Sequence, residues 1–292
     1  MIGRHFLAPL AYLSCVATAF AGAPTPEKEE PPEINTTLMS LTFKLVGDGA
    51  YGTAFVLGKP LPPPKDPMKV SYVMVTAAHV LDRIKGETAK LDLRKNDGQR
   101  FVKLQWEIRI RENGKALWSR HPSEDVAAMF VTLPEEAGVR PLPTSVLASD
   151  ETLKNLDIHP GDMLSCLGFP YGAAANDAGF PILRNGFIAS YPLLPVLKVK
   201  TFLFDMHVFE GNSGGPVYLA QVGARGMRDG GVALGGRFFF VAGLVTELTH
   251  GIEETKSSST EISLKLHNLG LAKVVHAAII RETIEMLPAE PK

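Results

Sequence analysis

The chain has 292 residues, of which 45% are hydrophobic and 21% are charged, and its formal net charge is −1. A chain of this length suggests about two structural units and buries enough surface to fold without a disulfide or a metal ion. The near-neutral charge gives no reason to expect a nucleic-acid or anionic-membrane partner.

The N-terminal residues have the pattern of an export signal. Arg4 precedes an apolar run from Phe6 to Ala21, which ends in the small-x-small pattern Ala19-Phe20-Ala21 of a cleavage site. The run is shorter than the roughly 20 apolar residues that a membrane span needs. We therefore expect a signal peptide over residues 1–21, a flexible Pro- and Glu-rich lead-in over 22–36, and no stable membrane insertion after cleavage.

The two cysteines indicate where the mature protein is found. Removal of the signal takes Cys15 with it, so only Cys166 remains and no internal disulfide can form. An exported protein without disulfides is more typical of a bacterial envelope or secreted protein than of an animal secreted one. The expected location is therefore periplasmic or extracellular. Cys166 lies among apolar neighbours, which favours a buried small hydrophobe over a nucleophile.

Short apolar runs separated by Gly, Pro, Asn and Asp make up most of the remaining chain. Their composition and length predict strands at 41–46, 53–57, 70–76, 90–94, 102–109, 126–133, 163–168, 186–190, 201–208, 216–220 and 238–246. Residues 59–68 predict a Pro-rich excursion, and the six glycines of 223–236 predict a hairpin tip. Closely spaced short strands with little helical periodicity predict an all-β fold.

One amphipathic helix is expected, at the C-terminal end of the chain. Leu271, Val274, Ala278 and Ile279 follow the 3.6-residue spacing of a helix with one apolar face, and Pro288 ends the pattern. The prediction is a helix over residues 271–288.

Three local patterns contain side chains suited to nucleophilic catalysis. Thr76-Ala77-Ala78-His79 follows a buried strand, and its small residues allow a turn that presents the imidazole in a cleft. Asp125-Val126-Ala127 places a carboxylate directly before an apolar strand, where it can hold an imidazole in one tautomer. Gly211-Asn212-Ser213-Gly214-Gly215-Pro216 places a serine in a glycine-rich turn, where backbone N–H groups can converge on one point.

Each pattern alone is common, but their order, His, then Asp, then Ser, is specific. In these motifs the sequence resembles the chymotrypsin/trypsin-like serine protease family, and its bacterial, disulfide-free members in particular. The resemblance covers roughly residues 37–287. It implies two six-stranded antiparallel β-barrels, over 37–145 and 146–270, followed by the C-terminal α-helix. The active site would lie in the cleft between the barrels.

The resemblance also implies roles for individual residues. His79 would be the general base, Asp125 would orient it, and Ser213 would attack the scissile carbonyl to give an acyl-enzyme. The N–H groups of Gly211 and Ser213 would form the oxyanion hole. The residues that by position would line the substrate pocket are His207, Val208, Thr246, Glu247 and Leu248.

The function expected from this resemblance is that of a serine endopeptidase acting on protein or peptide substrates. No cofactor is implied, the oligomeric state is left open, and the remaining histidines show no metal-ligand spacing. Two alternatives stay open. The first is a catalytically silent protease-like protein that binds peptides or a partner. The second is an α/β-hydrolase esterase, because the serine motif also fits Gly-x-Ser-x-Gly, although that fold requires a helix after the serine and the order Ser, Asp, His.

Overall fold

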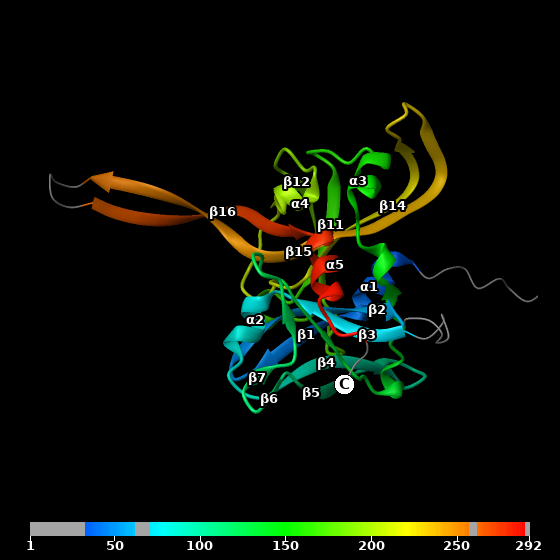
Figure 1. Ribbon diagram of the computed structural model, residues 1–292, viewed down its shortest axis with the longest axis vertical. Coiled ribbons are helices and arrows are strands. Elements are labelled where there is room, and N and C mark those ends of the chain that lie inside the picture. Colours follow the sequence, from blue (N-terminus) through cyan, green and yellow to red (C-terminus); the bar gives the residue numbers. More distant parts are fainter. Residues whose placement is uncertain (1–32, 62–69, 257–261, 290–292) are drawn as a thin grey trace, which may run out of the picture. The chain divides into compact units, whose positions relative to one another are not determined.

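The computed structural model describes residues 33–61, 70–256 and 262–289 (Figure 1). The expected signal peptide over 1–21 lies outside these residues, as do most of the expected lead-in and most of the Pro-rich excursion. Of the helices in the described residues, none combines the length and the apolar character that a membrane span requires.

The first half of the described chain forms one β-sheet whose strands follow the order β5-β4-β1-β2-β3-β9-β8, with β10 pairing in parallel to β2. Every other pair in this sheet is antiparallel. The strands are β1 (Thr42–Gly47), β2 (Ala50–Pro60), β3 (Val70–Thr76), β4 (Thr88–Asn96), β5 (Phe101–Arg109), β8 (Ser119–Arg120), β9 (Ala127–Phe130) and β10 (Leu142–Pro143). Two further short strands, β6 (Arg111–Glu112) and β7 (Lys115–Ala116), pair with each other.

The second half forms a closed antiparallel barrel of six strands in the order β11-β12-β13-β16-β15-β14. Its strands are β11 (Met163–Gly168), β12 (Ile182–Ile188), β13 (Thr201–Asp205), β14 (Pro216–Gly226), β15 (Val232–Lys256) and β16 (Ile262–His276). The predicted all-β class is confirmed, and the second unit has the predicted six strands. An α/β-hydrolase is excluded, because the chain after Ser213 enters strand β14 of an antiparallel barrel and not a helix.

The first sheet differs in detail from the expected six-stranded barrel. It has eight strands, and its ladder among the described residues runs from β5 to β8 without closing. The edge strand β5 mostly alternates exposed with half-buried residues, so it offers little apolar surface that closure would bury.

The described helices are short. They are α1 (Ile34–Leu41), α2 (Ala78–Arg83), α3 (Asp150–Asn155), α4 (Val196–Val199) and α5 (Ala277–Glu285), with 3₁₀ turns at Glu135–Ala137, Thr144–Val146 and Pro170–Gly172. Helix α1 begins inside the stretch expected to be flexible. The Glu33 carboxylate caps it by accepting hydrogen bonds from the N–H groups of Asn35 and Thr36, and Leu38 and Leu41 are buried.

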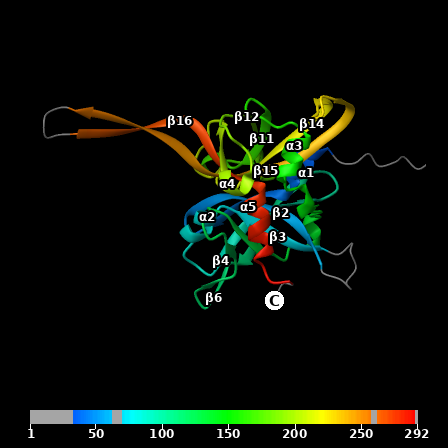
Figure 2. The same cartoon turned by 45° about the horizontal axis from the view of Figure 1, so that its top comes forward.

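The predicted C-terminal helix over 271–288 is wrong at its start. Helix α5 begins at Ala277, and residues 271–276 belong to β16. These residues match helical spacing, but they pair with β13 on one side and β15 on the other, and this pairing outweighs a weak local preference. Helix α5 contacts β8 and β9 of the first sheet and β15 and β16 of the barrel, and Figure 2 shows it between the two.

Two hairpins extend the barrel strands. The predicted hairpin tip over 223–236 is confirmed, since Gly223 pairs with Gly236 and Gly226 with Val232. The second hairpin was not expected: β15 and β16 pair from Gly243 and His276 out to Lys256 and Ile262, and they form the long ribbon at the left of Figure 1. We call residues 247–256 and 262–270 the β15–β16 arm.

Candidate active site

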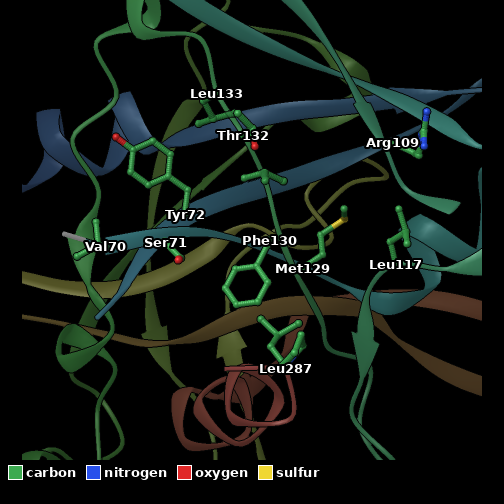
Figure 3. A pocket seen from close by; sticks show the side chains of 12 residues that line it. Val70, Ser71, Tyr72, Arg109, Leu117, Met129, Phe130, Thr132, Leu133 and Leu287 are labelled. Carbon is green, nitrogen blue, oxygen red and sulfur yellow. The ribbon is translucent and has the colours of Figure 1, made fainter. Parts of the chain in front are cut away.

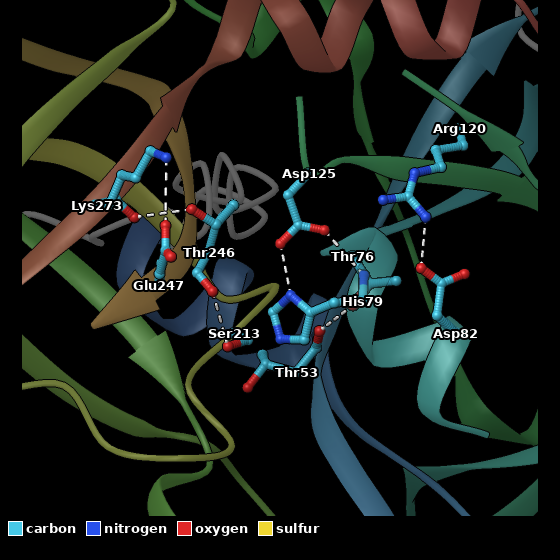
Figure 4. A network of polar contacts seen from close by, with 10 residues as sticks. All are labelled: Thr53, Thr76, His79, Asp82, Arg120, Asp125, Ser213, Thr246, Glu247 and Lys273. Carbon is cyan, nitrogen blue, oxygen red and sulfur yellow. Dashed lines mark hydrogen bonds and ion pairs between the residues drawn. The ribbon is translucent and has the colours of Figure 1, made fainter. Parts of the chain in front are cut away.

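His79 is placed by the end of strand β3 and the start of α2. Ala77 and Ala78 are fully buried, so the chain turns tightly against the core and α2 begins with little space on that side. The imidazole of His79 points into a cavity of about 540 Å³ that Asp125 and Ser213 also line. The structure therefore brings together the three residues that the motifs indicated (Figure 4).

Asp125 holds His79 through two hydrogen bonds. The backbone N–H of His79 donates to Oδ1 of Asp125 at 2.9 Å, and Nδ1 of the imidazole lies 2.5 Å from Oδ2. Burial raises the pKa of Asp125, but the hydrogen bonds and charge of His79 outweigh it and leave the pKa below its ordinary value. The carboxylate is therefore ionised at neutral pH and accepts a hydrogen bond from Nδ1–H, and in the tautomer that this bond selects Nε2 is a hydrogen-bond acceptor.

Ser213 lies in the turn between β13 and β14, and the turn depends on Gly214. Gly214 has φ +88°, and a Cβ there would lie 2.0 Å from the carbonyl oxygen of Thr53. The Gly214 N–H donates to the Val245 carbonyl at 2.7 Å. The Ser213 hydroxyl donates to the Thr246 carbonyl at 3.1 Å and makes no hydrogen bond to His79 in this arrangement.

The N–H groups of Gly211 and Ser213 donate to no acceptor within the described residues. The Glu210 carbonyl accepts a hydrogen bond from the Tyr171 N–H at 2.6 Å. Because C=O and N–H point in opposite directions across a trans peptide, this bond turns the Gly211 N–H away from Tyr171. The arrangement leaves two donors near Ser213 available to an anionic oxygen.

Thr53 is a residue that sequence reasoning did not single out for the site. It belongs to β2 of the first sheet, yet its hydroxyl donates to the Gly211 carbonyl at 2.7 Å and its N–H donates to the Ser213 carbonyl at 2.9 Å. Its own carbonyl accepts from the Thr76 hydroxyl at 2.7 Å. Thr53 thus fixes the serine turn of the barrel against the sheet that carries His79. The signal in the sequence is a threonine inside an otherwise apolar strand, in Gly52-Thr53-Ala54-Phe55-Val56.

Four of the five residues predicted for the substrate pocket line the same cavity as His79, Asp125 and Ser213. They are Val208, Thr246, Glu247 and Leu248. His207 does not line it. Its side chain is exposed and its ring lies against Gly270, where a Cβ would be 3.1 Å from Cε1. Residues alternate sides along an extended segment, so Val208 and His207 point in different directions. Val245, on the same strand as three of the predicted residues, lines the cavity as well, and Arg83, Phe209 and Glu210 also line it and were not predicted.

Other groups with possible chemistry lie apart from this cavity. Burial raises the pKa of Cys166 to about 12, so its thiol is unreactive. Within the residues that the structure describes, no three His, Cys, Asp or Glu side chains gather closely enough to hold a metal ion. A second cavity, of about 560 Å³, lies beside β3 and β9 and is lined mainly by apolar and uncharged side chains, with Arg109 as the charged exception (Figure 3).

No protein-family model and no curated protein matches the chain. Three similar solved structures have low sequence identity. Rv3671c from M. tuberculosis H37Rv, in an inactive form, is 16% identical over 93% of this chain and 97% of its own, with a TM-score of 0.44. Human heparin binding protein is 12% identical over 88% and 94%, with a TM-score of 0.46. The protease Anisep from Arthrobacter nicotinovorans is 14% identical over 87% and 98%, with a TM-score of 0.45.

The strand ladders themselves describe the fold that the motifs indicated. An antiparallel sheet unit carries His79 and Asp125, a closed six-stranded antiparallel barrel carries Ser213, and a C-terminal helix follows. This is the arrangement that the resemblance implied, except that the first sheet is open among the described residues.

Proposed function

We propose that this protein is an exported serine endopeptidase that hydrolyses peptide bonds through His79, Asp125 and Ser213. The observation that carries the proposal is the Asp125–His79 pair, which leaves Nε2 as a proton acceptor in the cavity that Ser213 lines. A histidine held in this tautomer beside a serine is the requirement for activating the hydroxyl as a nucleophile.

The reaction proceeds in two halves. Ser213 Oγ attacks the carbonyl carbon of the scissile bond while its proton moves to Nε2 of His79, and the imidazolium is stabilised by Asp125. The carbonyl oxygen becomes anionic and accepts hydrogen bonds from the N–H groups of Gly211 and Ser213. His79 then protonates the leaving amine, the C–N bond breaks, and water hydrolyses the acyl-enzyme by the same steps.

One rearrangement precedes the attack. The Ser213 hydroxyl donates to the Thr246 carbonyl in the free protein, so it turns about its Cα–Cβ bond to donate to His79. Hydrogen bonds among catalytic groups are often loose without substrate and tighten when it binds. The same bond is the observation that favours the alternative function, a protein that binds peptides in this cavity without cleaving them.

Labelling and turnover separate the two functions. We expect a fluorophosphonate to label the wild-type protein, and we expect fluorescein-labelled casein to be cleaved. Ser213→Ala should abolish labelling and lower turnover by roughly 10⁴- to 10⁶-fold. Ser165→Ala, on β11 outside the cavity, is the matched control and should retain both. Wild-type protein that binds casein peptides but resists labelling would establish the binding function instead.

Export is supported by the sequence pattern of residues 1–21. Expression of the full chain in a bacterial host should give a mature protein in the periplasm or the medium whose N-terminus follows Ala21. Recovery of the intact chain from the cytoplasm would contradict this part of the proposal.

A further inference from the structure

The outer edge of β15, on the side away from β16, changes its partner as it passes the candidate active site. Strand β14 pairs with this edge as far as the Pro216–Leu244 pair. The serine turn then covers the next two residues: Gly214 N–H donates to the Val245 carbonyl, Val245 N–H donates to the Gly215 carbonyl, and the Ser213 hydroxyl donates to the Thr246 carbonyl. From Glu247 onward, no described residue pairs with this edge.

The edge left open is long. Strand β15 continues to pair with β16 from Glu247 and Lys273 out to Lys256 and Ile262, which at roughly 3.4 Å per residue gives about 30 Å of open edge. A two-stranded ribbon is only marginally stable alone, and its unpaired N–H and C=O groups are ready to accept another strand. The arm thus presents a row of main-chain donors and acceptors that starts at the candidate nucleophile.

The base of the arm is joined to the barrel in a defined way. The ladder with β16 shifts register between Val245 and Glu247 and again between Leu248 and His250. Such irregularities bend a strand and change the direction of the ribbon that follows. Glu247 and Lys273 also form a cross-strand ion pair at 3.2 Å. Glu247 and Leu248 line the active-site cavity, so the cavity and the arm share one continuous edge.

We propose that strand addition continues along the arm: the substrate polypeptide docks as an added β-strand on the β15 edge from Thr249 to Lys256, beyond the residues that line the cavity. The location of the cut rests on the function proposed above. Every strand pair in the barrel is antiparallel, and an antiparallel addition directs the substrate's N-terminal side along the arm toward Lys256. The preferred substrates are therefore unstructured segments with about ten extended residues before the scissile bond. Short peptides and folded proteins are poor substrates.

A length series tests the proposal. Peptides that share one bond cleaved in casein are extended from about four to about twelve residues before that bond. We expect kcat/KM of the wild-type protein to rise roughly tenfold or more and then to level off, because several main-chain hydrogen bonds are added. Matched extension after the bond should add much less. A flat response to extension before the bond would overturn the proposal.

Two shortened variants locate the effect. In the first, Asn-Gly replaces residues 251–267 and joins His250 to Asn268, which are paired in the ladder. It should lose the gain from long peptides while cleaving short ones and reacting with fluorophosphonate at the wild-type rate. In the control, Asn-Gly replaces 224–235 between the paired Gly223 and Gly236, and the gain should remain. If the arm-shortened variant keeps the rise in kcat/KM with peptide length, the proposal is refuted. It is also refuted if the wild-type protein is a dimer and the deletion makes it a monomer without changing this length dependence, because the arm then serves dimerisation.

Two further measurements keep the test independent of folding and of catalysis. If the arm-shortened variant fails to react with fluorophosphonate, long peptides with N-methyl groups at alternate positions before the cut are used on the wild-type protein. N-methylation of every second residue can start at either of two positions. In one of these two sets, the rise in kcat/KM with peptide length should be lost. No loss in either set argues against strand addition. In Ser213→Ala, fluorescein-labelled long peptides should bind more tightly than short ones, and this holds even if the wild-type protein proves catalytically silent.

Discussion

At the scale of single residues, Thr53 shows how one hydroxyl can support a site that it does not enter. It bonds to the carbonyls of Gly211 and Ser213, and so fixes the peptide units that adjoin those presenting the Gly211 and Ser213 N–H groups. Thr53→Val keeps the shape of the side chain and removes the donor. We expect kcat to fall about tenfold with little change in KM, and stability to fall by about 1 to 3 kcal/mol because the Gly211 carbonyl loses its partner.

Peptide hydrolysis and urea unfolding measure these two effects. Thr53→Ser restores the donor and should recover most of the kcat, which a purely steric role for Thr53 would not allow. An unchanged kcat in Thr53→Val would show that the turn is held without this hydroxyl.

His276 is a buried histidine that the proposed mechanism does not use. It is 2% exposed, its Nε2 has no hydrogen-bond partner within the described residues, and burial lowers its pKa to about 4 despite the opposing charge of Asp150. In the folded protein the His276 imidazole therefore stays neutral down to about pH 4, whereas in the unfolded chain it takes up a proton near pH 6.5. Stability should fall by up to about 3 kcal/mol as the pH drops through this window.

Chemical denaturation between pH 7 and pH 4 measures this dependence. His276→Phe keeps a ring against Phe202 and should flatten the curve over that window. His159→Phe is the control, because the His159 side chain is 61% exposed, and its curve should match that of the wild type. If the free energy of unfolding of His276→Phe falls with pH as steeply as that of the wild type, the proton uptake belongs to other groups.

At the scale of elements, helix α5 is short but contacts both sheets. Ile279 and Ile280 are fully buried, so truncating either leaves a cavity beneath the helix. Ile280→Ala should lower the free energy of unfolding by about 2 to 5 kcal/mol. Met286 lies just after the C-terminal end of the same helix and is 50% exposed, so Met286→Ala should change the free energy of unfolding by less than about 0.5 kcal/mol. Similar losses in the two variants, measured by urea unfolding, would place α5 outside the core.

The bounds of the elements show which parts of the fold could be predicted from the sequence. Strands β3 and β11 have the predicted bounds, because each is a buried apolar run between clear turn residues. Helix α5 was extended too far, because the spacing of Leu271 and Val274 fits a helix as well as a strand with two partners. The sequence could indicate the three motif residues that line the cavity, because each motif lies within a few consecutive residues. Thr53 and the long arm were missed because they depend on pairing across more than 100 residues or on ladder length.

At the scale of the whole molecule, polar contacts join the sheet unit to the barrel. The Arg94 guanidinium lies between the rings of Phe43 and Phe180 and donates to the carbonyls of Thr42 and Gly179, each at 2.7 Å. Burial lowers the pKa of Arg94 to about 9. With Thr53 and α5, these contacts should make residues 33–292 unfold in one transition. Equal calorimetric and van't Hoff enthalpies would confirm it, and two separated heat-capacity peaks would contradict it.

The bonds between the serine turn and β15 also determine when, during synthesis, the candidate site can first form. His79 and Asp125 emerge early, but the serine turn is bonded to Val245 and Thr246, and the barrel closes only when β16 has been made. A chain halted on the ribosome anywhere before β16 therefore holds an imidazole and a carboxylate with no positioned nucleophile. The fold itself therefore delays assembly of the candidate site until nearly the whole polypeptide is complete.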